Sequence, residues 1–172
     1  MFALFFMTSG RDIVNSVLDV LPPFDVPFTK TLTVPVANVS TDYVRSPEIS
    51  MNIDLDAKIK QNNPNYSISN LKSVKMSTLS VDYVSSQFGT KLDVIKNMRV
   101  YLKAPNQPEK LIATAYNNTN PTTITFSVPD EELLNYFKTS ENSLIFEIQG
   151  SAVTADQVTM KINSGFKVKV QL

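Results

Sequence analysis

Residues 71–83 read Leu-Lys-Ser-Val-Lys-Met-Ser-Thr-Leu-Ser-Val-Asp-Tyr, and this stretch decides the fold class. Apolar and polar side chains alternate along it, which is the two-residue period of a β-strand with one buried face. The alternation slips by one residue between Met76 and Leu79, as a β-bulge would cause. The stretch therefore predicts a bulged strand in a sheet that covers an apolar core.

The same period recurs on both sides of this stretch, with turn residues between the runs. Residues 28–36 alternate but contain Pro35, which favours an edge strand or a bulge. The later runs lie at residues 98–102, 111–116, 124–126, 144–149 and 158–172. We expect the last run to fold into a β-hairpin around Asn163-Ser164-Gly165. About seven to nine strands at this spacing predict a mainly β protein with an antiparallel β-sandwich.

Two short helices accompany the predicted strands. Residues 12–21 place their apolar side chains on one helical face, and Pro22-Pro23 ends this N-terminal helix. Residues 127–138 begin with acidic side chains and carry an apolar stripe, which predicts one short crossover helix between late strands. Residues 51–60 fit both periods. Their strict alternation favours a strand, whereas the spacing of Leu55 and Ile59 would also suit a helix.

The N-terminal ten residues differ from the rest of the chain. Residues 1–7 are uninterruptedly apolar and are followed by Thr8-Ser9-Gly10, which predicts the remnant of an export signal; a hydrophobic segment of the fold is the alternative. We therefore divide the chain into residues 1–10, an amphipathic helix with a Pro-rich linker at 11–26, and a β-sandwich domain at 27–172. No stretch reaches the ~20 apolar residues of a membrane span. Membrane association would then occur through the N-terminus.

The composition excludes several classes of function. The 172 residues include 16 basic and 16 acidic side chains, so the formal net charge is zero and the electrostatic basis for binding nucleic acid is missing. His, Cys and Trp are absent, which excludes disulfides, thiol nucleophiles, every His-based triad and the commonest metal ligand. We expect no catalytic residue, no metal site and no cofactor.

Two loops combine a tyrosine with asparagines. Tyr66 lies near Asn63, and Tyr116 lies near Asn118. Aromatic rings and amides together are typical of sugar-binding sites, so these four residues are the candidate ligand-binding residues. The simpler interpretation is that the asparagines form turns and that each tyrosine is half-buried at the rim of the core.

Four segments together carry a resemblance to a known group of proteins. They are Asn-Leu-Lys-Ser-Val-Lys-Met at 70–76, Leu-Asp-Val-Ile-Lys-Asn-Met-Arg-Val-Tyr at 92–101, Leu-Leu-Asn-Tyr-Phe-Lys at 133–138 and Phe-Lys-Val-Lys-Val at 166–170. In this order they resemble small exported β-sandwich proteins of Bacteroidota, which are often lipid-anchored and largely without known biochemical function. The resemblance implies an immunoglobulin-like (Ig-like) sandwich and a helix before residue 71. Gly10 stands where the lipid-modified Cys would be.

From these observations we expect a non-enzymatic, exported β-sandwich located in the periplasm, the outer membrane or at the cell surface. It would act as a structural or protein-interaction module of the bacterial cell envelope, with a protein as its partner. The alternative is a carbohydrate- or small-ligand-binding module that uses the Tyr- and Asn-rich loops to hold a glycan.

Overall fold

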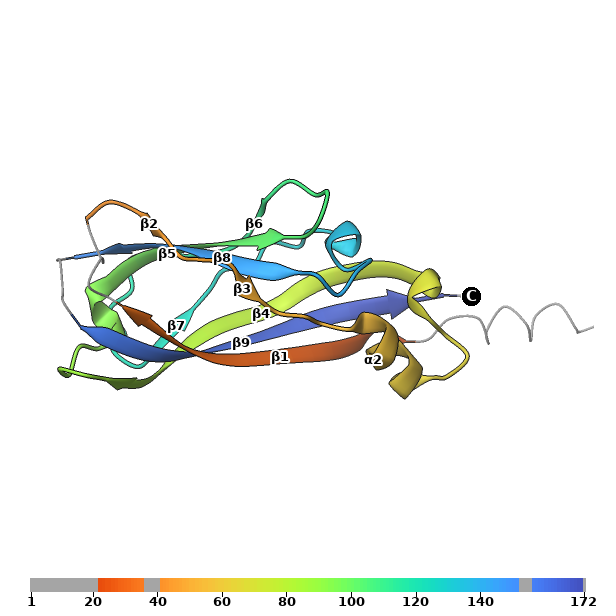
Figure 1. Ribbon diagram of the computed structural model, residues 1–172, viewed down its shortest axis with the longest axis horizontal. Coiled ribbons are helices and arrows are strands. Elements are labelled where there is room, and N and C mark those ends of the chain that lie inside the picture. Colours follow the sequence, from red (N-terminus) through yellow and green to blue (C-terminus); the bar gives the residue numbers. More distant parts are fainter. Residues whose placement is uncertain (1–21, 36–40, 152–155, 172) are drawn as a thin grey trace, which may run out of the picture.

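The computed structural model describes residues 22–35, 41–151 and 156–171. These residues form two antiparallel sheets that lie one above the other (Figure 1). The first sheet has the order β1 (Phe24–Pro35), β9 (Gln157–Val170), β4 (Leu71–Ser86) and β7 (Thr123–Thr125). The second has the order β2 (Val44–Arg45), β8 (Ser143–Gly150), β5 (Ile95–Lys103) and β6 (Lys110–Ala115), and β3 (Ile49–Ser50) also pairs with β8. The two layers fit the predicted antiparallel β-sandwich.

The strands pair in a nested order. β1 pairs with β9, β2 and β3 pair with β8, β4 pairs with β7, and β5 pairs with β6. Early strands therefore pair with late ones, from the two ends of the described chain inward to the β5–β6 hairpin. In an immunoglobulin domain the first and last strands lie in different sheets, whereas here they are neighbours in one sheet. The Ig-like order is thus not confirmed.

One apolar core fills the space between the sheets. The buried side chains of both layers form a single cluster, to which β4 contributes Val74, Met76, Leu79 and Val81. Phe137, from the segment between β7 and β8, meets Phe166 of β9 edge-on with the ring centroids 4.8 Å apart. Contacts of this kind join the long loops to the same core as the strands.

The predicted bulge in β4 is confirmed. The register between β4 and β9 shifts between Met76 and Thr78, and Gly165 of β9 lies opposite Thr78. A Cβ atom on Gly165 would lie 2.9 Å from the hydroxyl oxygens of both Ser77 and Thr78. Glycine is therefore used here for the close approach of two strands.

The predicted hairpin at 158–172 is wrong, because β9 runs straight through Asn163-Ser164-Gly165. Its burial alternates without a break: Ile162, Ser164 and Phe166 are buried, and the residues between them are not. A turn would have interrupted this alternation. Gly165 resembles a turn residue in the sequence, but in the structure it accommodates the bulge of β4.

Residues 51–60 are not a strand; they contain the start of the helix α2 (Leu55–Asn62). Asp54 caps this helix, since its carboxylate accepts a hydrogen bond of 3.0 Å from the Ala57 N–H. Leu55 and Ile59 face the core one turn apart. The helix implied by the family resemblance is therefore present, and the strand favoured by the alternation is not.

The predicted crossover helix at 127–138 is also wrong. Only a 3₁₀ turn, Leu134–Tyr136, forms there. The Glu132 carboxylate accepts hydrogen bonds from the backbone N–H groups of Leu133, Leu134 and Val74, and the Leu133 N–H donates to the Val74 carbonyl. A helix over 127–138 would need the N–H groups of Leu133 and Leu134 to donate to the carbonyls of Pro129 and Asp130, but they bond to Glu132 and Val74 instead.

The N-terminal predictions fall mostly outside the described residues. The segment 1–10 and the helix at 12–21 lie there entirely. β1 already begins at Phe24, so the last residues of the predicted linker belong to the first sheet. β1 has a strand partner on one side only in the described structure, which is the edge position that Pro35 favoured beside a bulge. None of the helices in the described part of the chain is long and apolar enough to cross a membrane.

Candidate functional site

Long polar side chains cover the outer face of the second sheet. Arg45, Glu147 and Arg99 lie side by side on β2, β8 and β5, because Arg45 and Arg99 are both register partners of Glu147. The neighbouring residues Val100 and Ile148 point into the core. The alternation of each strand therefore forces the charged side chains to the outside.

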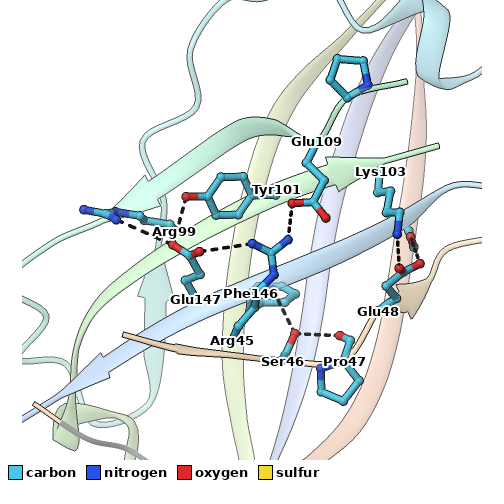
Figure 2. A network of polar contacts seen from close by, with 12 residues as sticks. Arg45, Ser46, Pro47, Glu48, Arg99, Tyr101, Lys103, Glu109, Phe146 and Glu147 are labelled. Carbon is cyan, nitrogen blue, oxygen red and sulfur yellow. Dashed lines mark hydrogen bonds and ion pairs between the residues drawn. The ribbon is translucent and has the colours of Figure 1, made fainter. Parts of the chain in front are cut away.

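Glu147 is the centre of this row (Figure 2). Its carboxylate lies 3.4 Å from a guanidinium nitrogen of Arg45 and 3.7 Å from one of Arg99, and it accepts a hydrogen bond of 3.0 Å from the Tyr101 hydroxyl. Arg45 also forms an ion pair with Glu109. One carboxylate thus orients three long side chains from two other strands.

Each of the two guanidinium groups lies over the ring of a tyrosine. The Arg99 guanidinium carbon lies 4.1 Å from the centroid of the Tyr43 ring, and that of Arg45 lies 5.4 Å from the Tyr101 ring. Both distances are within the range of cation–π attraction. We call this surface the arginine–tyrosine face; it consists of Tyr43, Arg45, Arg99, Tyr101, Glu109, Tyr116 and Glu147.

The pKa shifts on this face keep its arginines and the Tyr101 hydroxyl protonated at neutral pH. A hydrogen bond with Tyr116 raises the pKa of Arg99 above its ordinary value. Burial, followed by the hydrogen bond to Glu147, raises the pKa of the Tyr101 hydroxyl. Neither arginine nor Tyr101 therefore takes up or releases a proton near neutral pH.

The structure gives Asn63 and Tyr66 structural roles. Asn63 follows the last residue of α2, and its side-chain oxygen accepts a hydrogen bond of 3.0 Å from the Asn65 N–H. Tyr66 is only 3% exposed and belongs to the core cluster. A ligand on the surface could not stack on this ring.

Tyr116 and Asn118 differ from each other. Tyr116 is 54% exposed beside Arg99. The Asn118 side-chain amide donates to the carbonyls of Leu92, at 2.8 Å, and Ile95, at 3.1 Å, so it holds the start of β5. The segment with Tyr66 precedes β4, whereas Asn118 binds residues beyond the other end of β4. The four predicted ligand-binding residues therefore do not form one site.

Sequence reasoning missed most of the arginine–tyrosine face. Of its members, only Tyr116 was among the candidates. A signal was available at Arg99 and Tyr101, which alternate with Met98 and Val100 in a correctly predicted strand and must therefore share the outer face. The partners Tyr43, Arg45 and Glu109 gave no signal, because strand pairing brings them to this face from distant parts of the chain.

Within residues 22–35, 41–151 and 156–171, no group of three or more His, Cys, Asp or Glu side chains could hold a metal ion.

Comparisons with known proteins add little to this description. No family model and no curated protein matches the chain. Among solved structures, it is similar to "Structure of Turnip Yellow Mosaic Virus at 100 K", with 11% identity, a TM-score of 0.31 and coverage of 88% of this chain and 96% of that chain. It is also similar to "Acidic stable capsid structure of Helicobacter pylori bacteriophage KHP30", with 12% identity, a TM-score of 0.34 and coverage of 88% and 100%. TM-scores this low support no conclusion about the fold or the function of this chain.

Proposed function

We propose that this protein is a non-enzymatic interaction module that binds a protein partner through the arginine–tyrosine face. The observation that carries the proposal is the row in which Glu147 orients Arg45, Arg99 and Tyr101 on an exposed sheet. Arg and Tyr are enriched among the residues that dominate the affinity of protein interfaces.

The rigidity of the row supports the same function. Each arginine contacts both a carboxylate and a ring, although the Arg45 and Arg99 side chains remain 43% and 38% exposed. Side chains that are already ordered lose less conformational entropy when a partner covers them. The two arginines also balance Glu109 and Glu147, so the face offers no net positive charge to a nucleic acid.

We also propose a double-sheet jelly roll as the finer description of the fold, in place of an Ig-like sandwich. β2 and β3 both pair with β8, so they count as two parts of one strand, which leaves eight strands in two sheets. A jelly roll has eight strands, and the nested pairing of early with late strands fits that fold. Such a fold presents each sheet as a broad outer face.

The cellular location is proposed from the sequence. The apolar residues 1–7, followed by small residues, support export to the periplasm, the outer membrane or the cell surface. In that location the module would act as a structural or adaptor component of the envelope.

Photo-cross-linking in the cells that make the protein tests the proposed face. A benzoylphenylalanine at position 116 should yield one dominant cross-linked protein, whereas the same residue at position 125, on the outer face of the first sheet, should not. The change Arg99→Ala should weaken binding of the purified partner about tenfold or more, as expected for a hot-spot arginine. Lys161→Ala, on the first sheet, is the matched control. Equal cross-linking at both positions, or unchanged affinity in Arg99→Ala, would contradict the proposal.

A further inference from the structure

We infer that a second surface, a polar cleft at one end of the second sheet, binds a short neutral oligosaccharide. The cleft has a volume of about 410 Å³ and is formed by three separate segments of the chain. They are the β3 region with residues 48–52, the β5–β6 turn with residues 103–107, and residues 141–143 at the start of β8. This volume lies within the range of small-ligand sites.

The cleft has a firmly bonded base. Asn142 is 2% exposed, and its carbonyl accepts a hydrogen bond of 2.8 Å from the Met51 N–H. Its side-chain oxygen lies 3.4 Å from the Ile53 N–H. The strand β8 is thereby tied to the segment that leads into α2, so two of the three cleft segments are held at a defined separation.

Two of the charges on the cleft wall, Glu48 and Lys103, neutralise each other, and Glu141 adds one further carboxylate. Glu48 forms an ion pair with Lys103 (Figure 2). Its carboxylate also accepts a hydrogen bond of 3.3 Å from the Ser143 hydroxyl. Because of its hydrogen bond to Lys103, the pKa of Glu48 lies below its ordinary value, and that of Lys103 lies above its own. Both groups therefore stay charged at neutral pH. Because each is the counter-ion of the other, neither needs an oppositely charged group on a ligand.

Amide side chains lie around this ion pair. Asn52, Asn106 and Gln107 line the cleft, and in the described part of the chain no hydrogen bond engages their side-chain amides. An amide presents a donor and an acceptor side by side. That arrangement matches the adjacent hydroxyl groups of a sugar, each of which can donate and accept.

The backbone does not require these amides. Asn52 and Asn106 have φ values of +50° and +59°, in the left-handed region that asparagine tolerates and glycine prefers. Glycine would therefore hold the same two turns without an amide. The presence of Asn at both positions leaves the side chain available for a ligand.

Other classes of ligand fit the cleft less well. An anion would approach the carboxylates of Glu48 and Glu141, while a cation would approach Lys103. The residues that line the cleft include no aromatic ring, and their apolar members are Ala104 and Pro105. A polyhydroxylated neutral molecule is the class whose hydroxyl groups can pair with the amides of the cleft, and the unpaired carboxylate of Glu141 does not repel it.

The test is an NMR titration of the full chain labelled with ¹⁵N. The neutral probes are maltotriose, cellotriose, mannotriose and triacetylchitotriose, and the charged comparators are trigalacturonate and the deacetylated chitosan trimer. We expect saturable shifts of the amides at 50–52, 104–107 and 141–143 with at least one neutral probe, and weaker binding of both charged comparators. If no neutral probe produces saturable shifts there, or if a charged comparator binds more tightly, the inference is wrong.

Matched variants separate binding from folding. Asn52→Gly and Asn106→Gly should each weaken binding roughly threefold to tenfold, as the loss of one or two neutral hydrogen bonds would. Asn117→Gly is the control, because Asn117 has a φ of +53° and does not line the cleft. Unchanged affinity in both cleft variants, or an equal loss in the control, would overturn the inference. Arg99→Ala should leave sugar binding unchanged, so this inference and the proposed partner-binding face can fail separately.

Discussion

The outer faces of the two sheets use polar side chains in different ways. On the first sheet, hydrogen bonds link Thr29, Asn163, Asp82 and Thr123 into a row that crosses β1, β9, β4 and β7, with a diagonal step from Asn163 to Asp82. The Asn163 amide donates to Asp82 at 2.8 Å, the Thr123 hydroxyl donates to Asp82 at 3.0 Å, and the Thr29 hydroxyl donates to Asn163 at 3.3 Å. These short side chains bond mainly to one another.

The second sheet instead carries long planar groups around Glu147, namely Arg45, Arg99 and Tyr101. Their rings and guanidinium groups have area that a partner can cover, which the hydroxyls of the first sheet lack. Both rows cross a sheet, but we expect the first to contribute to the stability of the fold and the second to the affinity for a partner.

The largest effect on stability is expected at Gly165, where the first sheet leaves no room for a side chain. Gly165→Val should reduce the free energy of unfolding by about 1–3 kcal/mol, because its side chain would collide with Ser77 and Thr78 at the bulge. Urea denaturation measures this loss. Thr125→Val, on the exposed face of β7, is the control and should change stability by less than about 0.5 kcal/mol. A Gly165→Val protein as stable as the control would contradict the close approach of β4 and β9.

A buried carboxylate holds the connection through which the chain passes from the first sheet to the second. Asp156 is 2% exposed and accepts hydrogen bonds of 3.0 Å from the N–H groups of Gln87, Phe88 and Thr90. Burial raises its pKa, but the hydrogen bonds from Thr90 and Phe88 outweigh burial, so the pKa lies below its ordinary value.

The folded state therefore favours the ionised form of Asp156. Its contribution to stability is present above the ordinary Asp pKa of about 3.9 and is lost as the pH falls through the lower pKa of the folded protein. Asp156→Asn should lower the melting temperature at pH 7, by less than Gly165→Val does, and the difference from the wild type should shrink at pH 3. Circular dichroism melts measure both values, with the exposed Asp25→Asn as control. A difference that grows in acid would show the opposite sign of pKa shift.

A smaller loss is expected within the row of the first sheet. Asp82→Ala removes the acceptor of both Thr123 and Asn163 and should cost about 1–2 kcal/mol. The effect should depend on the partner, so a double-mutant cycle with Asn163→Ala should give a coupling of about 0.5 kcal/mol or more. Strictly additive losses would mean that this row does not stabilise the sheet.

The smallest effect on stability is expected on the second sheet. Arg99→Ala should change the free energy of unfolding by only about 0–1 kcal/mol, because its ion pair with Glu147 is partly exposed and 3.7 Å long. Urea denaturation of Arg99→Ala and Asp82→Ala side by side sharpens the comparison. If Arg99→Ala is the less stable of the two, the arginine–tyrosine face is primarily structural.

The sequence predicted the strands better than their connections. Alternation located β4 and its bulge correctly because both depend on the local burial of Val74, Met76 and Leu79. It failed at Gly165, where the reason for glycine is Ser77 on another strand, and at 127–138, where Glu132 bonds to β4. The arginine–tyrosine face was missed for the same physical reason, since pairing between distant strands assembles it.

The position of β9 has a consequence for how the protein is made. β9 is the last strand in the described chain, yet it lies in the middle of its sheet, between β1 and β4. On the ribosome, more than a hundred further residues must be synthesised after β1 before its neighbour β9 emerges. Pairing over such sequence separations closes slowly, so we expect the first sheet to form only after translation of β9 and to refold on the scale of milliseconds to seconds.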